Sequence, residues 1–277
     1  MTLQHVVVGT DGSLVSVRAL DWAADEAVRY RAGLRIVYAV PDRDEAGPVL
    51  ASATARVHAR HPGLTLTSRA VAGSPARALA EESEDAVLTV VGSRGFGGVT
   101  GLLAGSVSLR LAAQARGPLL VVRGDHPCDG GQAVLLGLED DSDTEATAYA
   151  FAEAERRCVR LRVLHSRTHR HITPELPSPI PATSPGQRHL DREDRAEEAV
   201  PRFSLARLEE RHPGVEVDAR TVRTGPAHAL LAATDDSAVV VIGAHRRAGR
   251  LGPQLGPVAH TLLHRSHCPV VLVPTTG

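Results

Sequence analysis

The sequence predicts an α/β protein built from two tandem doubly wound domains, each with a five-stranded parallel sheet and helices on both faces. Three observations lead to this prediction. The chain, 277 residues long, repeats itself once. Each copy carries short apolar runs that are typical of strands buried on both faces. Helical patterns lie between these runs, and strands that alternate with helices form parallel sheets through right-handed crossovers.

The repeat is visible in motifs that recur at a fixed spacing. RVHARHPG begins at Arg56 and RLEERHPG begins 151 residues later, and the same spacing links Gly92 to Gly243. Near the start of each copy, VVVGTD and VLLGLE are only 128 residues apart. The second copy therefore holds about 23 additional residues. We place the two domains at residues 1–125 and 131–277.

The additional residues lie between about 167 and 190, in RTHRHITPELPSPIPATSPGQRHL. Five prolines between Pro174 and Pro185 exclude a helix or a central strand. The segment is therefore predicted to be an extended surface loop. PELP also fits the short PxxP pattern of docking segments, so a partner-docking loop is the alternative.

The elements of the first copy follow from its patterns in order. Five apolar runs predict the strands: HVVVGT from His5, RIVYAV from Arg35, LTLTSRAV from Leu64, AVLTVVGS from Ala86 and PLLVVR from Pro118. Between the first two runs, one helical face is formed by Val17, Leu20, Ala24, Ala27 and Val28. We place Ser13 as the N-cap of this helix and Gly33 as its C-terminal stop.

Composition excludes several classes of function. A net charge of −1 and 3% aromatic residues argue against nucleic-acid binding, which needs basic charge and stacking side chains. All 31 basic residues are arginine, so any mechanism that requires lysine is excluded. Three cysteines without paired spacing indicate a reducing compartment. With neither a signal-peptide pattern nor a run of about 20 apolar residues, we expect a cytoplasmic protein without a membrane partner.

Two segments follow strands at the edge of the sheet where such folds bind ligands: GTDGS after the first strand, and GSRGFGGVTGLLAGS, residues 92–106, after the fourth. A phosphate-binding P-loop requires lysine and is excluded. A dinucleotide G-x-G-x-x-G fingerprint begins at Gly95 and Gly97, but Thr100 stands at the third glycine. The glycine-rich segment therefore belongs to neither of these types.

A third pattern, G-x2-G-x9-G-[ST], fits Gly92, Gly95, Gly105 and Ser106. The first two glycines would let backbone approach a ribose and phosphates without a Cβ in the way. Gly105 and Ser106 open the helical run SVSLRLAAQA, whose first N–H groups would face an anion. The alternative is a flexible loop in which Ser106 only caps a helix.

With these motifs, VVGTDGS and VVGSRGFGGVTGLLAGSVS, the chain resembles the tandem-domain form of the universal stress proteins. The resemblance implies a Rossmann-like fold of the adenine nucleotide alpha hydrolase type and a bound ATP. It implies that Gly92, Arg94 and Gly95 approach ribose and phosphates, that Gly105, Ser106 and Val107 hold the phosphates, and that Asp11 and Val40 border the adenosine. Gly9 and Ser93 complete the candidate set.

The second copy departs from this motif. It keeps Gly243 and Gly256, but Arg246 replaces Gly95 and Pro257 replaces Ser106. Asp11 becomes Glu139, and Val40 aligns near Arg167. Proline is tolerated in the first turn of a helix, so we expect the fold to survive and ATP binding to be weak or lost. The alternative is that Arg246, Arg247 and His245 bind a different anion.

Two other clusters have simpler interpretations. His264, His267 and Cys268 suggest a metal site, but they fall between a helix and a strand with no fourth ligand, and His is favoured at a helix C-terminus for its own reasons. Three acids, Asp140, Asp141 and Asp143, fall at a helix start, where solvated capping acids are common.

We therefore expect a protein that binds ATP in its first domain as a regulatory or sensing ligand, with a largely structural second domain. No general base is evident, which favours binding over catalysis. A slow ATP hydrolase or nucleotide transferase is the alternative, with Asp11 positioning Mg2+. A dimeric interaction scaffold without nucleotide is the third. The runs PLLVVR and PVVLVP could pair the two domains edge to edge within one chain, and a homodimer is a further possibility.

Overall fold

The computed structural model describes residues 4–40, 43–93, 106–123, 131–139, 143–166, 205–222, 224–244, 246–249 and 252–275. The first half contains β1 (His5–Gly9), α1 (Leu14–Arg29), β2 (Gly33–Val40), the 3-10 helix η1 (Arg43–Ala46), α2 (Gly47–Arg60), β3 (Leu66–Ala72), α3 (Pro75–Glu82), β4 (Leu88–Gly92), α4 (Ser106–Gln114) and β5 (Leu119–Val122). The proline-rich segment predicted as a surface loop lies outside the described residues.

The second half repeats this order. It contains β6 (Ala133–Leu138), α5 (Thr144–Arg157), β7 (Arg160–Ser166), a helical stretch at 205–209, β8 (Val217–Val222), α7 (Pro226–Ala232), β9 (Val239–Ala244), β10 (Arg246–Gly249), β11 (Gly252–Leu255), α8 (Pro257–Arg265) and β12 (Val270–Pro274). None of the described helices is long and apolar enough to cross a bilayer.

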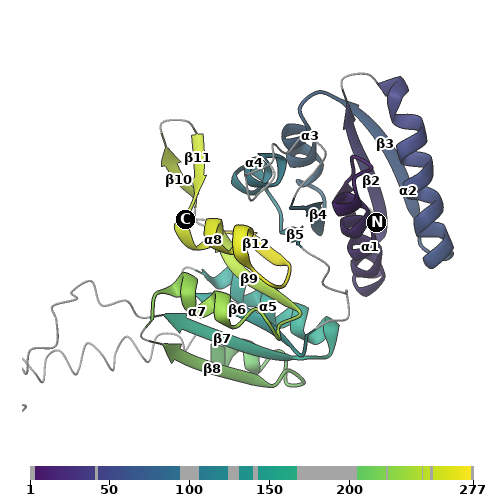
Figure 1. The fold of residues 1–277 in the computed structure, drawn as a ribbon. Coiled ribbons are helices and arrows are strands. Elements are labelled where there is room, and N and C mark those ends of the chain that lie inside the picture. Colours follow the sequence, from purple (N-terminus) through teal and green to yellow (C-terminus); the bar gives the residue numbers. More distant parts are fainter. Residues whose placement is uncertain are drawn as a thin grey trace, which may run out of the picture.

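All of these strands except β10 and β11 form one sheet with the order β3-β2-β1-β4-β5-β12-β9-β6-β7-β8 (Figure 1). Within each half the neighbours are parallel, so the predicted five-stranded parallel sheets are confirmed. The two halves meet where β5 and β12 pair antiparallel, with Leu120 opposite Val271. The strongly apolar edges of the two half-sheets are therefore covered by each other.

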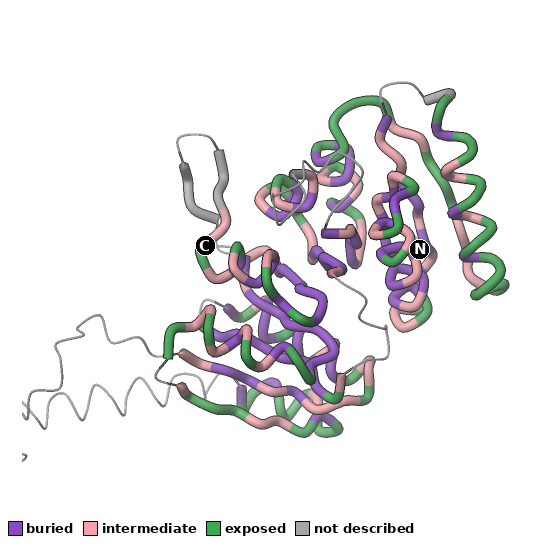
Figure 2. The backbone as a smooth tube through the Cα atoms, in the orientation of Figure 1, coloured by how far each residue is buried: buried purple, intermediate pink, exposed green. Residues whose placement is uncertain are grey.

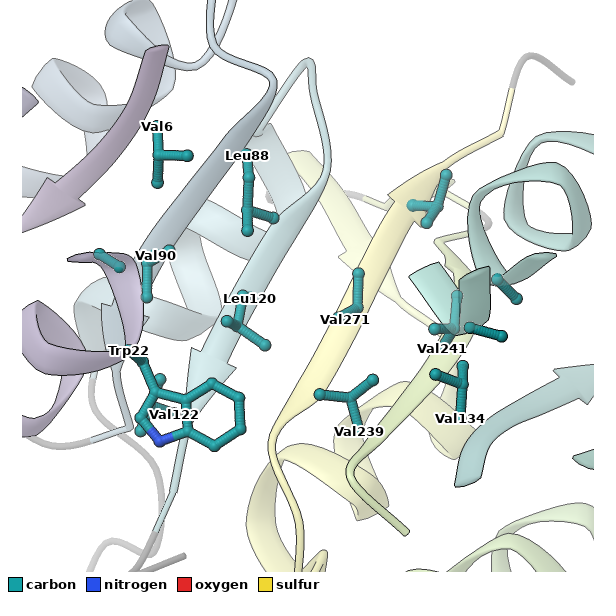
Figure 3. Packing of buried hydrophobic residues seen from close by; sticks show 14 of the residues in the cluster. Val6, Trp22, Leu88, Val90, Leu120, Val122, Val134, Val239, Val241 and Val271 are labelled. Carbon is teal, nitrogen blue, oxygen red and sulfur yellow. The ribbon is translucent and has the colours of Figure 1, made fainter. Parts of the chain in front are cut away.

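Two hydrophobic layers continue across this junction, one on each face of the sheet. The first contains side chains of α1, α2 and α5 and of strands from both halves. In Figure 3, Leu120 of β5 lies beside Val271 of β12, and Trp22 of α1 belongs to the same layer. The second layer joins α3, α4, α7 and α8. Burial is concentrated in the central strands, whereas the outermost strands β3 and β8 are largely exposed (Figure 2).

The ends of α1 test the sequence signals for this helix. Ser13 is its N-cap, as predicted, and accepts a hydrogen bond from the backbone N–H of Ser16. Gly33 is not its stop: Arg31 adopts the left-handed conformation, with φ of 51°, and Gly33 begins β2. Val28 was predicted on the buried face but is 51% exposed. Three residues separate the helix from the strand, and the turn falls on Arg31 before the glycine is reached.

A buried ionic cluster joins α1 of the first half to α5 of the second. The Arg157 guanidinium donates to Glu153 at 2.5 Å and also to Glu26, across the junction. These three side chains are at most 5% exposed. Arg156 donates to the Tyr30 hydroxyl at 2.8 Å and stacks on its ring, 4.1 Å from the centroid. The helices of the two halves are therefore held together by charge as well as by apolar contact.

Burial and charge oppose each other within this cluster. Burial raises the pKa of Glu26, with Arg157 acting in the opposite direction. Burial acts in the same way on Glu153, but Arg157 and Arg156 outweigh it, so the pKa of Glu153 is lowered. Burial disfavours the charged form of Arg157, and the two carboxylates overcome it and raise its pKa. Arg157 is therefore the cation that the two acids share, while Arg29 also pairs with Glu26 and Arg156 also pairs with Glu153.

Replacing Arg157 by methionine leaves two buried carboxylates without their shared cation. Removing one partner of a buried ion pair costs about 3–5 kcal/mol, and we expect the free energy of unfolding to fall by that amount in urea titrations. Arg77→Met is the matched control, because Arg77 pairs with Glu81 at the same i, i+4 spacing but is 82% exposed. The free energy of unfolding of this control variant should fall by less than about 1 kcal/mol. Equal losses in the two variants would contradict the assigned role of Arg157.

Candidate functional site

The candidate site lies where the strand order of the first half reverses, between β1 and β4. Ligands of doubly wound sheets bind at this point, outside the carboxyl ends of the strands. Here β1 ends at Gly9 and β4 ends at Gly92, and the two strands are direct neighbours. The structure therefore brings together the ends of the two segments that the sequence analysis selected.

Hydrogen bonds fix the turn after β1. The Asp11 carboxylate accepts from the backbone N–H of Ser13 at 3.0 Å. The backbone N–H of Asp11 donates to Ser16 Oγ at 3.3 Å, and Ser16 Oγ lies 3.2 Å from Thr10 Oγ1. The Thr10 backbone N–H donates to Val37 O of β2 at 3.0 Å. Sequence reasoning missed Thr10 and Ser16, whose hydroxyls are typical of turns and helix starts and carry no distinctive motif.

The segment after β4 begins in the same fixed way. The Ser93 backbone N–H donates to Val122 O at 2.9 Å, and the Ser93 side chain is buried. Its carbonyl accepts from Ser108 Oγ of α4 at 3.5 Å. The next described residue is Ser106, the first residue of α4. The leading N–H groups of a helix have no partner within the helix. A helix over this run is confirmed, while its predicted start at Gly105 and Ser106 stays a prediction, because residues 94–105 lie outside the described part of the chain.

The remaining candidate residues differ in where they lie. Val40, at the end of β2, is buried. Val107 packs against the second hydrophobic layer from the first turn of α4. Arg94, Gly95 and Gly105 lie outside the described residues.

Packing explains two of the candidate glycines. A Cβ at Gly92 would lie 2.7 Å from Val15 Cγ1 and 2.9 Å from the Val15 carbonyl oxygen. A Cβ at Gly9 would lie 2.7 Å from Leu79 of α3. At Gly92 the backbone of α1 therefore leaves no room for a side chain, a reason that does not involve a ligand. At Gly9 the reason is weaker, because only the flexible end of the Leu79 side chain would have to move.

The second half keeps the start of the helix and changes its surroundings. Gly256 is the N-cap of α8 and Pro257 lies in its first turn, so the predicted survival of the fold is confirmed. Arg246 begins a two-stranded hairpin, β10–β11, in the part of the chain that corresponds to the glycine-rich segment. The sequence did not predict this hairpin, which projects beyond α8 in Figure 1. Arg167 and His245 lie outside the described residues.

Asp143 contradicts the prediction of solvated capping acids, because it is 1% exposed. Its carboxylate accepts from the Glu139 backbone N–H at 2.7 Å. It also lies against Gly243, where a Cβ would come within 2.1 Å of Asp143 Oδ1. Asp140 and Asp141 lie outside the described residues. The Asp143 carboxyl group is therefore buried at the carboxyl ends of the strands β6 and β9.

The histidine cluster is rearranged relative to the sequence interpretation. The neighbour of His264 is His260, one turn earlier on α8, with Nε2 atoms 3.2 Å apart. Cys268 is buried instead, with its backbone and sulfur next to Ser266 Oγ. The i, i+4 spacing could have identified the His260–His264 pair. Among the described residues, no group of three or more possible metal ligands comes together.

Comparison with known proteins decides the family. The model of the Universal stress protein family matches the chain twice, over residues 2–123 and 132–274. The chain belongs to the universal stress protein family. A universal stress protein of Mycolicibacterium smegmatis is 34% identical over 292 residues, which cover 97% of this chain and 96% of that protein. A universal stress protein of Mycobacterium tuberculosis is 31% identical over 296 residues, 97% of each chain.

A solved structure supports the same architecture. The crystal structure of a universal stress protein from Archaeoglobus fulgidus DSM 4304 matches with a TM-score of 0.70 and covers 99% of both chains. At 17% identity this likeness shows the fold alone. The resemblance to tandem universal stress proteins, which the sequence analysis drew from two motifs, is therefore confirmed over the full length.

In this tandem universal stress protein, Gly92→Ala tests the packing role of the strand end. The new methyl group would meet the backbone of Val15, which cannot rotate away, and we expect a loss of about 1–3 kcal/mol in the free energy of unfolding. Gly63→Ala is the control, because a Cβ there meets nothing within 4 Å. Adding Val15→Ala should recover only part of the loss, since the carbonyl oxygen remains. Full recovery would show that backbone does not contribute to the clash.

Proposed function

We propose that the first half binds ATP as a regulatory or sensing ligand and that the second half does not. The observation that carries this proposal is the position of α4. The first turn of this helix of nine residues lies at the end of β4, where Ser108 Oγ donates to the Ser93 carbonyl. There β4 neighbours β1 at the strand-order reversal. Such groups bind phosphates through backbone donors and the helix dipole, without lysine.

The described residues suit the other parts of a nucleotide. The Asp11 carboxylate accepts from the Ser13 N–H, and a carboxylate is an acceptor-only group of the kind that binds ribose hydroxyls. Val40 supplies an apolar surface at the end of β2, next to the same edge. Family membership supports the same assignment, since the G-x2-G-x9-G-[ST] spacing occurs in the first half and is broken in the second.

Two changes argue against ATP in the second half. Pro257 removes an N–H group and the hydroxyl that Ser106 offers at the start of the helix. Asp143 places a carboxylate against Gly243, the counterpart of Gly92. A phosphate bound there would face a like charge in a buried setting, where Coulomb repulsion is strong.

Binding is favoured over hydrolysis because Asp11 is engaged by its own turn. A hydrogen bond from the Ser13 N–H holds one carboxylate oxygen in the loop, as expected of a residue that shapes a binding site. A slow hydrolase, with Asp11 positioning Mg2+, remains the second candidate. Steady ADP production from Mg-ATP that is lost in Asp11→Asn would favour it.

Nucleotide content tests the proposal directly. Denaturing the purified protein and measuring the released adenine nucleotide by mass spectrometry should give one molecule per chain and not two. Gly105→Arg should abolish this nucleotide, because the side chain would occupy the phosphate position before α4. Gly256→Arg, the same change before α8, should leave the content unchanged. Equal effects of the two variants would refute the assignment of ATP to the first half.

Thermal denaturation with added ATP gives an independent measurement. A ligand at a hundred times its Kd stabilises the folded state by about 2.7 kcal/mol, and the midpoint should rise accordingly. The rise should persist in Gly256→Arg and vanish in Gly105→Arg. If the protein releases no nucleotide, and if ATP shifts the thermal midpoint of neither the unmodified protein nor Gly256→Arg, the third hypothesis, an interaction scaffold, is favoured.

A further inference from the structure

The second half holds a cavity at the position that corresponds to the candidate ATP site. Its volume is about 240 Å³, and it opens at the carboxyl ends of β6, β7 and β9, next to the start of α8. Its described walls are mostly apolar, with Leu138, Leu164, Pro226, Leu230 and Ile242 among them. The second copy has therefore lost the glycine motif but kept a space that could hold a small molecule.

The polar end of this cavity differs from the first half by one exchange of side chains. In the first half, the backbone N–H of Asp11 donates to the Ser16 hydroxyl. In the second half, the backbone N–H of Glu139, the counterpart of Asp11, donates to the Asp143 carboxylate. Both accepting side chains are buried. A carboxylate therefore takes the structural place of a hydroxyl and brings a negative charge to the cavity wall.

A second acid strengthens this difference. Glu139 also lines the cavity. Unlike Asp143, which is buried, Glu139 is exposed. A carboxylate accepts hydrogen bonds and donates none, and its two oxygens offer about four acceptor positions whichever partners it already has. This end of the cavity is therefore complementary to N–H donors and to positive charge, and it is opposed to phosphate.

We propose that the cavity of the second half binds a small, largely apolar molecule with a cationic N–H donor group, such as an aryl amidinium or ammonium compound. The donor group lies at Asp143 and Glu139, and the apolar part lies against Leu164, Leu230 and Ile242. A charge-assisted hydrogen bond in a partly buried site gives this class its advantage over neutral and anionic analogues. The site is separate from the ATP site proposed above, so either assignment can fail without the other.

Three probes of nearly equal size isolate the effect of charge: benzamidine, benzamide and benzoate. Binding is followed through the δ1-methyl signals of isoleucine. The chain has only four isoleucines, and Ile242 lines the cavity, whereas Ile36 lies in the core of the first half. Benzamidine should shift the Ile242 signal without moving that of Ile36, and it should bind about tenfold more tightly than benzoate. Benzamide should fall between them.

Asp143→Asn tests the cause of this preference, because it keeps the shape and an acceptor for Glu139 N–H and removes the charge. The benzamidine preference over benzoate should fall about tenfold. Glu155→Gln is the control, since it makes the same change at the far end of α5, where Glu155 pairs with His212. Glu139→Gln, at an exposed position, gives a second test that does not depend on how Asp143→Asn folds, and it should also reduce the preference.

Benzamidine-selective shifts of Ile242 that weaken in Asp143→Asn and Glu139→Gln, and not in Glu155→Gln, support the site. Benzoate binding as tightly as benzamidine, no Ile242 shift with any probe, or a preference unchanged in both cavity variants would overturn it. ATP binding at Ile242 would overturn it as well and would also contradict the stoichiometry expected above.

Discussion

The antiparallel pairing of β5 with β12 is the constraint on which the rest of the structure depends. It joins two half-sheets into one and lets each hydrophobic layer run from one half into the other. It also brings α1 against α5, where two glutamates are buried and Arg157 is shared between them. An ion pair of this kind adds little net stability compared with apolar side chains, but an unpaired member is costly, so it selects one relative placement of the halves. The two candidate sites are therefore carried by one continuous sheet, which we call the frame.

Within this frame the two halves share one backbone arrangement at the ends of their first strands and differ in a side chain that holds it. Each half has a glycine at or next to the end of its first strand, Gly9 and Gly137, close to a leucine of a following helix, Leu79 and Leu230. In each half, the N–H group two residues after that glycine is held by a side chain from the next helix or its cap. The holding atom is the Ser16 hydroxyl in the first half and the Asp143 carboxylate in the second. The two halves thus share this backbone arrangement, and the buried side chain that differs between them carries a charge in the second half only.

The sequence predicted the parts of the fold that local patterns determine. Apolar runs located the strands, and Ser13 and Pro257 marked helix starts, because strand burial and helix capping depend on nearby residues. Prediction from the sequence failed for features that depend on tertiary contacts or on a one-residue change in the alignment of the two copies. Gly33 was too far from the end of α1 to stop it. Asp143 could not be matched to Ser16, because the copies differ in length by one residue at this turn and the match is visible only in equivalent hydrogen bonds.

Peptide-resolved hydrogen exchange, with and without ATP, tests most directly the central claim that one frame carries an ATP site in the first half only. The account predicts slower exchange on ATP addition in the turn after β1, residues 10–16, and in the first turn of α4. It predicts no change in residues 137–147 or in the first turn of α8. Protection of the second set in place of the first, or equal protection of both, would contradict it.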